Sequence, residues 1–70
     1  MAFQSTIGKE IQERRKELGI TQPELAELAA VNVNTIVRLE RGVSNPTLAV
    51  LVRIGEALGM EVTIRVKHKA

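Results

Sequence analysis

The sequence contains no cysteine, aspartate, tyrosine or tryptophan, and it contains one histidine. Without cysteine, neither disulfide bonds nor thiolate zinc ligands can stabilise the fold. The missing side chains also leave few groups for a hydrolytic triad, a multi-ligand metal site or a platform that stacks nucleic-acid bases. We therefore expect a protein that is not an enzyme and that uses no metal ion and no cofactor.

Long apolar runs are also missing. The longest, residues 48–52, has five residues, and the N-terminus has no basic segment followed by an apolar one. We therefore expect no signal peptide and no membrane span, which fits a cytoplasmic protein. The 70 residues allow one small domain with a modest core, because a domain usually has about 100 to 200 residues.

The positive charge is concentrated at one end of the chain. The formal net charge is +2. Residues 1–60 contain equal numbers of basic and acidic side chains, whereas residues 61–70 contain Arg65, Lys67 and Lys69 against Glu61. The body of the chain is therefore neutral, and the C-terminal tail carries the excess.

Four short helices are expected, at residues 6–18, 22–29, 33–41 and 48–58. Glycines that end helices alternate with side chains that cap helix N-termini, and these caps are Ser5 or Thr6, Thr21, Asn32 and Thr47. The segment Thr21-Gln22-Pro23-Glu24 has the form of a capping box, in which the threonine hydroxyl and the glutamate each bind a free backbone N–H. Caps and glycines at this density predict a mainly α protein.

Apolar side chains recur at helical spacing in each of these segments. The side chains expected to face the core are Ile7, Ile11, Leu18, Leu25, Leu28, Ala29, Ile36, Leu39, Leu48, Leu51, Val52, Ile54 and Leu58. The opposite face of the last helix carries Val50 and Ala57. These two are either scattered surface residues or part of a contact between subunits.

The last segment changes period. Residues 61–67 alternate between polar and β-branched apolar side chains, which predicts a β-strand with Val62, Ile64 and Val66 on one face. A lone strand leaves its backbone groups unpaired, and only the short segment 2–5 is a possible partner within the chain. We therefore expect the strand to pair with the same segment of a second copy in a homodimer. A frayed polar tail is the alternative.

The helix expected over residues 33–41 has an outer surface that suits DNA. If Ile36 and Leu39 face the core, the residues left outside are Val33, Asn34, Val37, Arg38 and Arg41. Arginine can bind guanine, asparagine can bind adenine, and a valine methyl group can contact the thymine methyl. An ordinary amphipathic helix is the alternative, but a short turn joins this helix to the preceding one, as in helix-turn-helix motifs.

Five blocks of sequence between Ile7 and Gly59 occur in a familiar order. They are Thr21-Gln22-Pro23-Glu24-Leu25-Ala26, Val31-Asn32, Thr35-Ile36, Leu39-Glu40-Arg41-Gly42 and Asn45-Pro46-Thr47-Leu48. Together they resemble the Cro/C1-type, or XRE-like, helix-turn-helix family. The resemblance implies a compact, lambda-repressor-like bundle of four or five helices, here with a C-terminal β-strand. It also implies that the third helix enters the major groove of double-stranded DNA.

The resemblance implies roles for residues at matching positions. The base-reading residues are Asn32, Val33, Asn34 and Arg38. The phosphate-binding residues are Gln22, Thr35, Arg41, Ser44 and Asn45, with weaker candidates at Lys9, Gln12 and Arg14. Arg15 and Glu40 match a partly buried salt bridge between the first and third helices. Ala30 stands where the family usually has glycine, so this turn either avoids a left-handed conformation or accepts strain.

These features divide the chain into an N-terminal arm (1–5), a DNA-binding domain (6–59), and a C-terminal strand with a basic tail (60–70) for dimerisation. The dimer interface is expected at Val62, Ile64, Val66, Val50 and Ala57. We expect a sequence-specific DNA-binding transcriptional regulator, acting as a dimeric repressor on a palindromic operator. The tail also resembles that of HipB-like antitoxins, so one alternative is an antitoxin that regulates its own operon and binds a toxin kinase. A second alternative is a protein-interaction module that keeps the fold without binding DNA.

Overall fold

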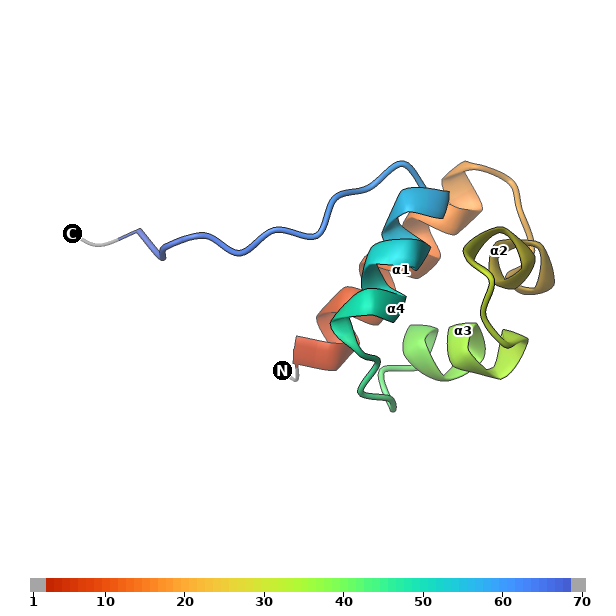
Figure 1. Cartoon of the computed structure of the whole chain (residues 1–70), viewed down its shortest axis with the longest axis horizontal. Coiled ribbons are helices and arrows are strands. Elements are labelled where there is room, and N and C mark those ends of the chain that lie inside the picture. Colours follow the sequence, from red (N-terminus) through yellow and green to blue (C-terminus); the bar gives the residue numbers. More distant parts are fainter. Residues whose placement is uncertain (1–2, 69–70) are drawn as a thin grey trace.

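Four helices form the body of the protein, and a tail extends from it (Figure 1). The computed structural model describes residues 3–68. The helices are α1 (Phe3–Glu17), α2 (Gln22–Ala29), α3 (Val33–Glu40) and α4 (Leu48–Ala57). α1 packs against α3, and α2 packs against both α3 and α4. The expectation of a mainly α fold with a helix-turn-helix is confirmed, and no helix within residues 3–68 is long and apolar enough to span a bilayer.

Side-chain caps begin three of the helices. The Thr21 hydroxyl accepts a hydrogen bond from the Glu24 N–H (3.2 Å), and the Thr21 N–H donates to Glu24 Oε1 (2.8 Å). The bond from the Thr21 backbone N–H holds the pKa of the Glu24 carboxyl below its usual value. Asn32 caps α3 and Thr47 caps α4 through their side-chain oxygens. The predicted starts of α2, α3 and α4 are therefore confirmed.

α1 begins earlier than the sequence pattern predicts. It starts at Phe3, so Ser5 and Thr6 lie within the helix and the expected cap at either residue is wrong. Glycine and proline, the residues that interrupt helices, are absent from residues 3–6. Residues 3–5 of the expected N-terminal arm therefore belong to α1, and residues 1–2 lie outside the described part of the chain.

The core uses one narrow stripe from each helix. Its buried apolar side chains are Ile11, Leu25, Ala26, Ala29, Ile36, Leu39, Ile54 and Leu58. Leu18 and Leu28 were expected there, but they are 43% and 63% exposed. Leu28 lies roughly 100° around α2 from the centre of that helix's buried stripe, and Leu18 follows the last residue of α1. The prediction for Leu28 is therefore wrong because periodicity alone does not give the width of the stripe, and the prediction for Leu18 is wrong because the helix ends before it.

α4 is rotated relative to the expected orientation. Ile54 is buried, and Val50 and Ala57 pack against the core. Leu48 and Val52, which were expected in the core, are 62% and 37% exposed. Because five consecutive apolar residues cover the whole circumference of a helix, the pattern could not select the buried face. The placement of Val50 and Ala57 on the outer face of α4 is therefore wrong, and Leu48 and Val52 are the large apolar residues on that face. The part of Val50 and Ala57 in a subunit contact stays a prediction.

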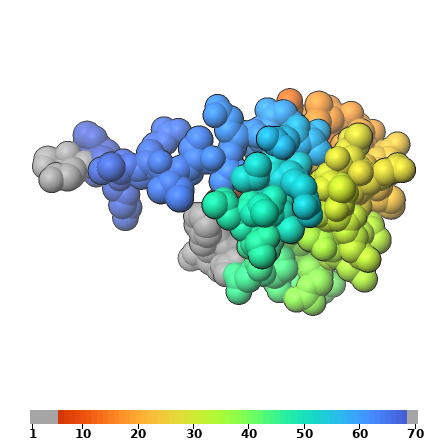
Figure 2. Space-filling view, in the orientation of Figure 1, coloured from red at the N-terminus to blue at the C-terminus, as the bar shows by residue number. Residues whose placement is uncertain are grey.

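The tail is exposed and projects from the rounded body (Figure 2). Residues 61–68 are all exposed, and no β-strand occurs in the described chain. The strand predicted for residues 61–67 is therefore not supported in the single chain. Beyond the base of the tail no other described segment runs beside it (Figure 1), so its backbone N–H and C=O groups have no partner strand.

Candidate nucleic-acid interface

A tight turn joins α2 to α3. Ala30 has a left-handed conformation, with φ 57° and ψ 46°. Its N–H donates to the Glu27 carbonyl (3.2 Å), and the Val31 N–H donates to the Ala26 carbonyl (2.9 Å). Asn32 then caps α3. Of the two possibilities left open at Ala30, the turn adopts the strained one, which costs about 1–2 kcal/mol for a residue with a Cβ.

Buried contacts fix the orientation of α3. Ile36 and Leu39 are buried on its inner face. On α1, Gly8 lies so close to the Leu39 carbonyl oxygen that a Cβ at Gly8 would collide with it. Only glycine fits at such a backbone contact, and no sequence pattern pointed to this role for Gly8. The packing of α3 against α1 and α2 decides which α3 residues face solvent.

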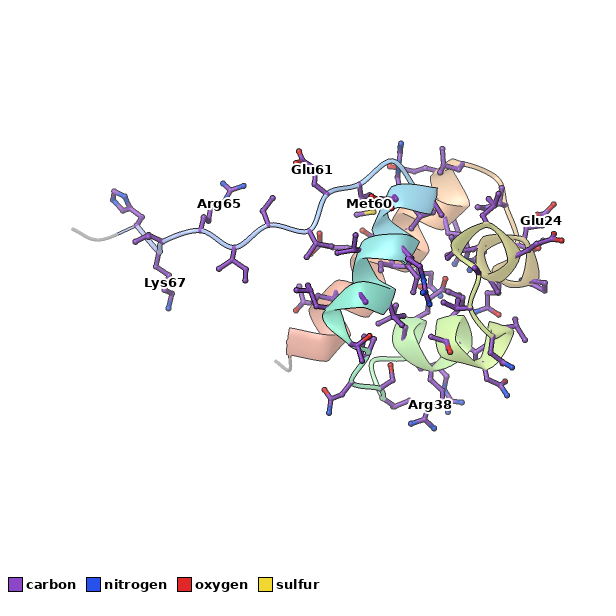
Figure 3. All side chains as sticks on the ribbon, viewed as in Figure 1. Glu24, Arg38, Met60, Glu61, Arg65 and Lys67 are labelled. Carbon is purple, nitrogen blue, oxygen red and sulfur yellow. The ribbon has the colours of Figure 1, made fainter. Side chains whose placement is uncertain are left out.

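The outer surface of α3 is polar and basic, and it has no exposed acidic side chain. The exposed residues along α3 and at its C-cap are Val33, Asn34, Arg38 and Arg41. Val37, which was expected to be exposed, is half-buried. Arg38 points away from the body (Figure 3). Arg38 Nη2 also donates to the Val43 carbonyl (3.3 Å), which holds the guanidinium beside the loop that follows α3.

A groove of about 450 Å³ lies between α3 and the loop before α4. Its lining residues are Asn32, Asn34, Thr35, Arg38, Ser44, Asn45, Pro46, Thr47 and Val50. Most of them are residues for which the resemblance implies DNA contacts, so the structure brings two separate segments together on one surface. Pro46 and Thr47 were not predicted here. The sequence feature that could have indicated them is their position just before α4. The backbone N–H groups at the N-terminus of a helix favour anions.

A buried ion pair ties α1 to α3 beneath this surface. Arg15 Nε and Nη2 donate to the two Glu40 carboxylate oxygens at 2.6 and 3.0 Å. Burial raises the pKa of Glu40, but hydrogen bonds from Arg15 and Gln22 and the charge of Arg15 outweigh it, so this pKa lies below its usual value. The hydrogen bond to Glu40 raises the pKa of Arg15. Both side chains are therefore charged at neutral pH, and the salt bridge implied by the resemblance is present.

Gln22 extends this network toward the start of α2. Its Nε2 donates to Glu40 Oε1 (3.0 Å), and the residue is half-buried. Gln22 does not line the groove, so it is separate from the loop residues with which the resemblance groups it. A carboxamide nitrogen carries two N–H groups, and Glu40 uses one of them.

The weaker candidates on α1 do not line the groove either. Arg14 Nε donates to the Leu58 carbonyl (2.9 Å), which ties α1 to the end of α4. Gln12 forms a hydrogen bond with Glu40. Lys9 is exposed. Two of the three side chains therefore have structural contacts within the body.

Comparison with known proteins identifies the class to which this fold and surface belong. The chain belongs to the helix-turn-helix family, whose sequence model matches residues 11–64. It is 53% identical over 51 residues to an uncharacterized HTH-type transcriptional regulator of Methanothermobacter thermautotrophicus. That match covers 73% of this chain and 74% of the relative.

Two further relatives are longer. The immunity repressor protein of Bacillus phage phi105 is 38% identical over 58 residues, which are 83% of this chain and 40% of the repressor. An uncharacterized HTH-type transcriptional regulator of Haemophilus influenzae is 38% identical over 63 residues, which are 86% of this chain and 64% of that protein. The chain thus spans less than two thirds of each of these two relatives.

Proposed function

We propose that this chain is a dimeric repressor that binds an approximately palindromic operator in the cytoplasm. Membership of the helix-turn-helix family and the names of the relatives, two transcriptional regulators and an immunity repressor, make the chain a DNA-binding transcriptional regulator. The observation that carries the proposal is the exposed, acid-free surface of α3 beside the groove. No enzymatic step is part of this function.

Base reading is assigned to α3 and its cap. The Arg38 guanidinium fits guanine O6 and N7, and the Asn34 amide fits adenine N6 and N7. Val33 is 38% exposed and offers methyl groups to thymine. The side-chain Oδ1 of Asn32 accepts a hydrogen bond from the Asn34 backbone N–H (2.8 Å), so the side-chain NH₂ group of Asn32 is the part available to a base.

Phosphate binding is assigned to the loop across the groove. Ser44 Oγ is buried and has no hydrogen-bond partner among the described residues. An unpaired buried hydroxyl costs about 1–3 kcal/mol, and this hydroxyl would donate a hydrogen bond to a phosphate oxygen in the groove. Thr35 and Asn45 line the same groove, and Arg41 is exposed at the end of α3. Such contacts orient the protein on the duplex without reading its sequence.

Gln22 is assigned a phosphate at a separate place, the start of α2. The hydrogen bond between Gln22 Nε2 and Glu40 holds the amide in one orientation. The second N–H of the same nitrogen is then available for a phosphate oxygen. Glu40 thereby supports both the packing of α3 and the orientation of a DNA contact.

Two copies match the symmetry of a palindromic operator. A two-fold dimer would present its two α3 helices to successive major grooves, about 34 Å apart. The exposed apolar residues of the tail support a contact between copies, because Val62, Ile64 and Val66 are 42%, 94% and 88% exposed. A run of exposed apolar side chains is typical of an interface.

The test begins with selection of bound sequences from a pool of random DNA duplexes. Fluorescence anisotropy on the selected duplex and on a scrambled one then measures the variants. Arg38→Ala is expected to weaken binding to the selected duplex about 10- to 100-fold, since one base contact contributes about 1–3 kcal/mol. Binding to the scrambled duplex should change far less.

Arg53→Ala is the matched control. Arg53 is an exposed arginine on α4 that does not line the groove, so this variant loses the same charge elsewhere. Its affinity for the selected duplex should stay within about twofold of the original. Equal losses on both duplexes for Arg38→Ala would remove Arg38 as a base reader. Failure to select any duplex would leave a protein-interaction module as the better explanation of the fold.

A further inference from the structure

The tail has an apolar face that is covered at one end. A Cβ at Gly55 would lie 3.7 Å from Val62 Cγ2, so the first apolar residue of the tail rests on α4. Val62 is 42% exposed, whereas Ile64 and Val66 are 94% and 88% exposed. Val62 also borders a groove of about 290 Å³ between α1 and α4. The apolar face of the tail therefore starts at this α1–α4 groove and continues beyond the body, where no other described segment packs against it.

We propose that this face is covered by the tail of a second copy, paired as an antiparallel strand with the two Ile64 residues opposite each other on the two-fold axis. This inference rests on the homodimer proposed above and adds its register. Val62 then lies opposite Val66 of the partner subunit, and Glu61 lies opposite Lys67 of the partner subunit. Each copy contributes residues 61–67 to the pair.

Side-chain alternation limits the possible registers. Residues opposite each other in a strand pair point to the same face. Apolar residues therefore meet apolar residues only when a residue, and not a peptide bond, lies on the axis. Three residues in the middle of the tail fit this condition, namely Thr63, Ile64 and Arg65.

Charge and packing distinguish these three registers. An axis at Arg65 places two arginines opposite each other, which is unfavourable. An axis at Thr63 also pairs opposite charges, Glu61 with Arg65 of the partner subunit. It places Val66 opposite Met60 of the partner subunit, however, and the Met60 N–H already donates to the Gly55 carbonyl (2.8 Å) within the body. An axis at Ile64 pairs all seven alternating residues and places opposite charges at both ends. Figure 3 shows Glu61 at the base of the tail and Lys67 toward its far end, as this pairing requires.

The same register places complementary groups at the α1–α4 groove. Val66 of the partner subunit would lie beside Val62, where it can cover the apolar lining formed by Ile7, Ile11 and Leu51. Lys67 of the partner subunit would lie opposite Glu61 on the other face of the strand pair, because successive side chains of a strand point to opposite faces. Eight residue steps of about 3.4 Å separate the two Met60 residues by roughly 27 Å. The tail runs along the longest axis of the chain (Figure 1), so the two bodies would lie at opposite ends of the strand pair.

Single cysteines distinguish the registers, because the natural chain has none. Thr63→Cys, Ile64→Cys and Arg65→Cys are compared in the full chain under mild oxidation, at a concentration where light scattering shows a dimer. Only the residue on the axis faces its own copy at a Cβ separation of about 4.5–5.5 Å. Ile64→Cys should form the disulfide-linked dimer at least about tenfold faster than the other two. Faster linkage at residue 63 or 65 would overturn the register.

Charge reversal tests the pairing without a covalent link. Glu61→Lys and Lys67→Glu should each raise the dimer dissociation constant about tenfold, and the double variant should restore it. Circular dichroism checks that the helices are unchanged. Failure of the double variant to recover would overturn the Glu61–Lys67 pairing. These measurements use no DNA, so their failure leaves the DNA-binding proposal standing, and a monomer at all concentrations would overturn the homodimer itself.

Discussion

Ile54 and Ile64 have the same side chain and lie ten residues apart, but their surroundings are opposite. Ile54 is 0% exposed in the body, and Ile64 is 94% exposed in the tail. The helices of the body bury their apolar stripes against one another within a single chain. The tail has an equally regular pattern but finds no surface within the chain to complete it. A regular apolar pattern therefore predicts that the apolar face of a segment packs against another surface. It does not predict whether that surface belongs to the same chain or to another copy.

The largest effect should follow truncation of the buried isoleucine. Ile54→Ala removes three carbon atoms from the centre of the core and leaves a cavity that the surrounding helices fill only partly. We expect a loss of about 4 kcal/mol in the free energy of unfolding, measured by urea denaturation and circular dichroism. Val52→Ala on the same helix is the control, because Val52 is partly exposed, and it should lose less than about 1 kcal/mol. Similar losses for the two variants would contradict the observed rotation of α4.

The ion pair between α1 and α3 should give the next largest effect. Glu40→Ala leaves the Arg15 charge buried without its partner and frees Gln22. We expect a loss of about 3 kcal/mol in urea unfolding. A loss below about 0.5 kcal/mol would show that the pair acts like a surface salt bridge. The control, Glu56→Ala, removes an exposed carboxylate from α4 and should have little effect.

Because of the ion pair between Arg15 and Glu40, we expect the stability of the folded protein to depend on pH. The pKa of Glu40 is lowered in the folded protein, so its stabilisation is fully present above the ordinary glutamate pKa of about 4.3 and declines as the pH falls below that value. The stability difference between the natural chain and Glu40→Gln should therefore shrink between about pH 4.5 and pH 2. Glu24 is present in both proteins, so its own lowered pKa cancels in the difference. A constant difference over this range would contradict the assignment.

The sequence was informative where the determinants are local. Thr21, Asn32 and Thr47 cap helices because each interacts with a backbone N–H two or three residues away, and this spacing is visible in the sequence. The buried face of α4 was not predictable, because apolar residues surround that helix and only the neighbouring helices select Val50 over Val52.

The features of the candidate interface also divide into those that local sequence determines and those that it does not. The residues of α3 that face outward follow from the burial of Ile36 and Leu39, which the spacing indicated. The groove that joins α3 to Ser44 and Asn45, and the bond between Gln22 and Glu40, depend on how separate segments pack. Such contacts between distant residues leave no periodic signal in a single sequence.

A substitution in the turn between α2 and α3 should change the free energy of unfolding by a smaller amount, and it should raise that free energy instead of lowering it. Ala30 has a φ of 57°, which glycine adopts without the penalty of a Cβ. Ala30→Gly should stabilise the body by about 0.5 kcal/mol, because relief of strain exceeds the added entropy of the unfolded chain. Ala29→Gly, one residue earlier in right-handed helical backbone, should instead destabilise it by about 1 kcal/mol. Destabilisation by both variants would contradict the left-handed turn.

The smallest effect on the body should come from the exposed isoleucine of the tail. Ile64→Ala removes the same atoms as Ile54→Ala, but in the single chain Ile64 has almost no contacts to lose. At concentrations where light scattering shows a monomer, the free energy of unfolding should change by less than about 0.5 kcal/mol. At concentrations where the natural chain is a dimer, the same variant should weaken the dimer, because two methyl-rich side chains would be lost from its axis. A loss above about 1 kcal/mol in the monomer would instead mean that the tail packs against its own body. Ile54 and Ile64 would then both contribute to packing within one chain, and only the size of their contributions would differ.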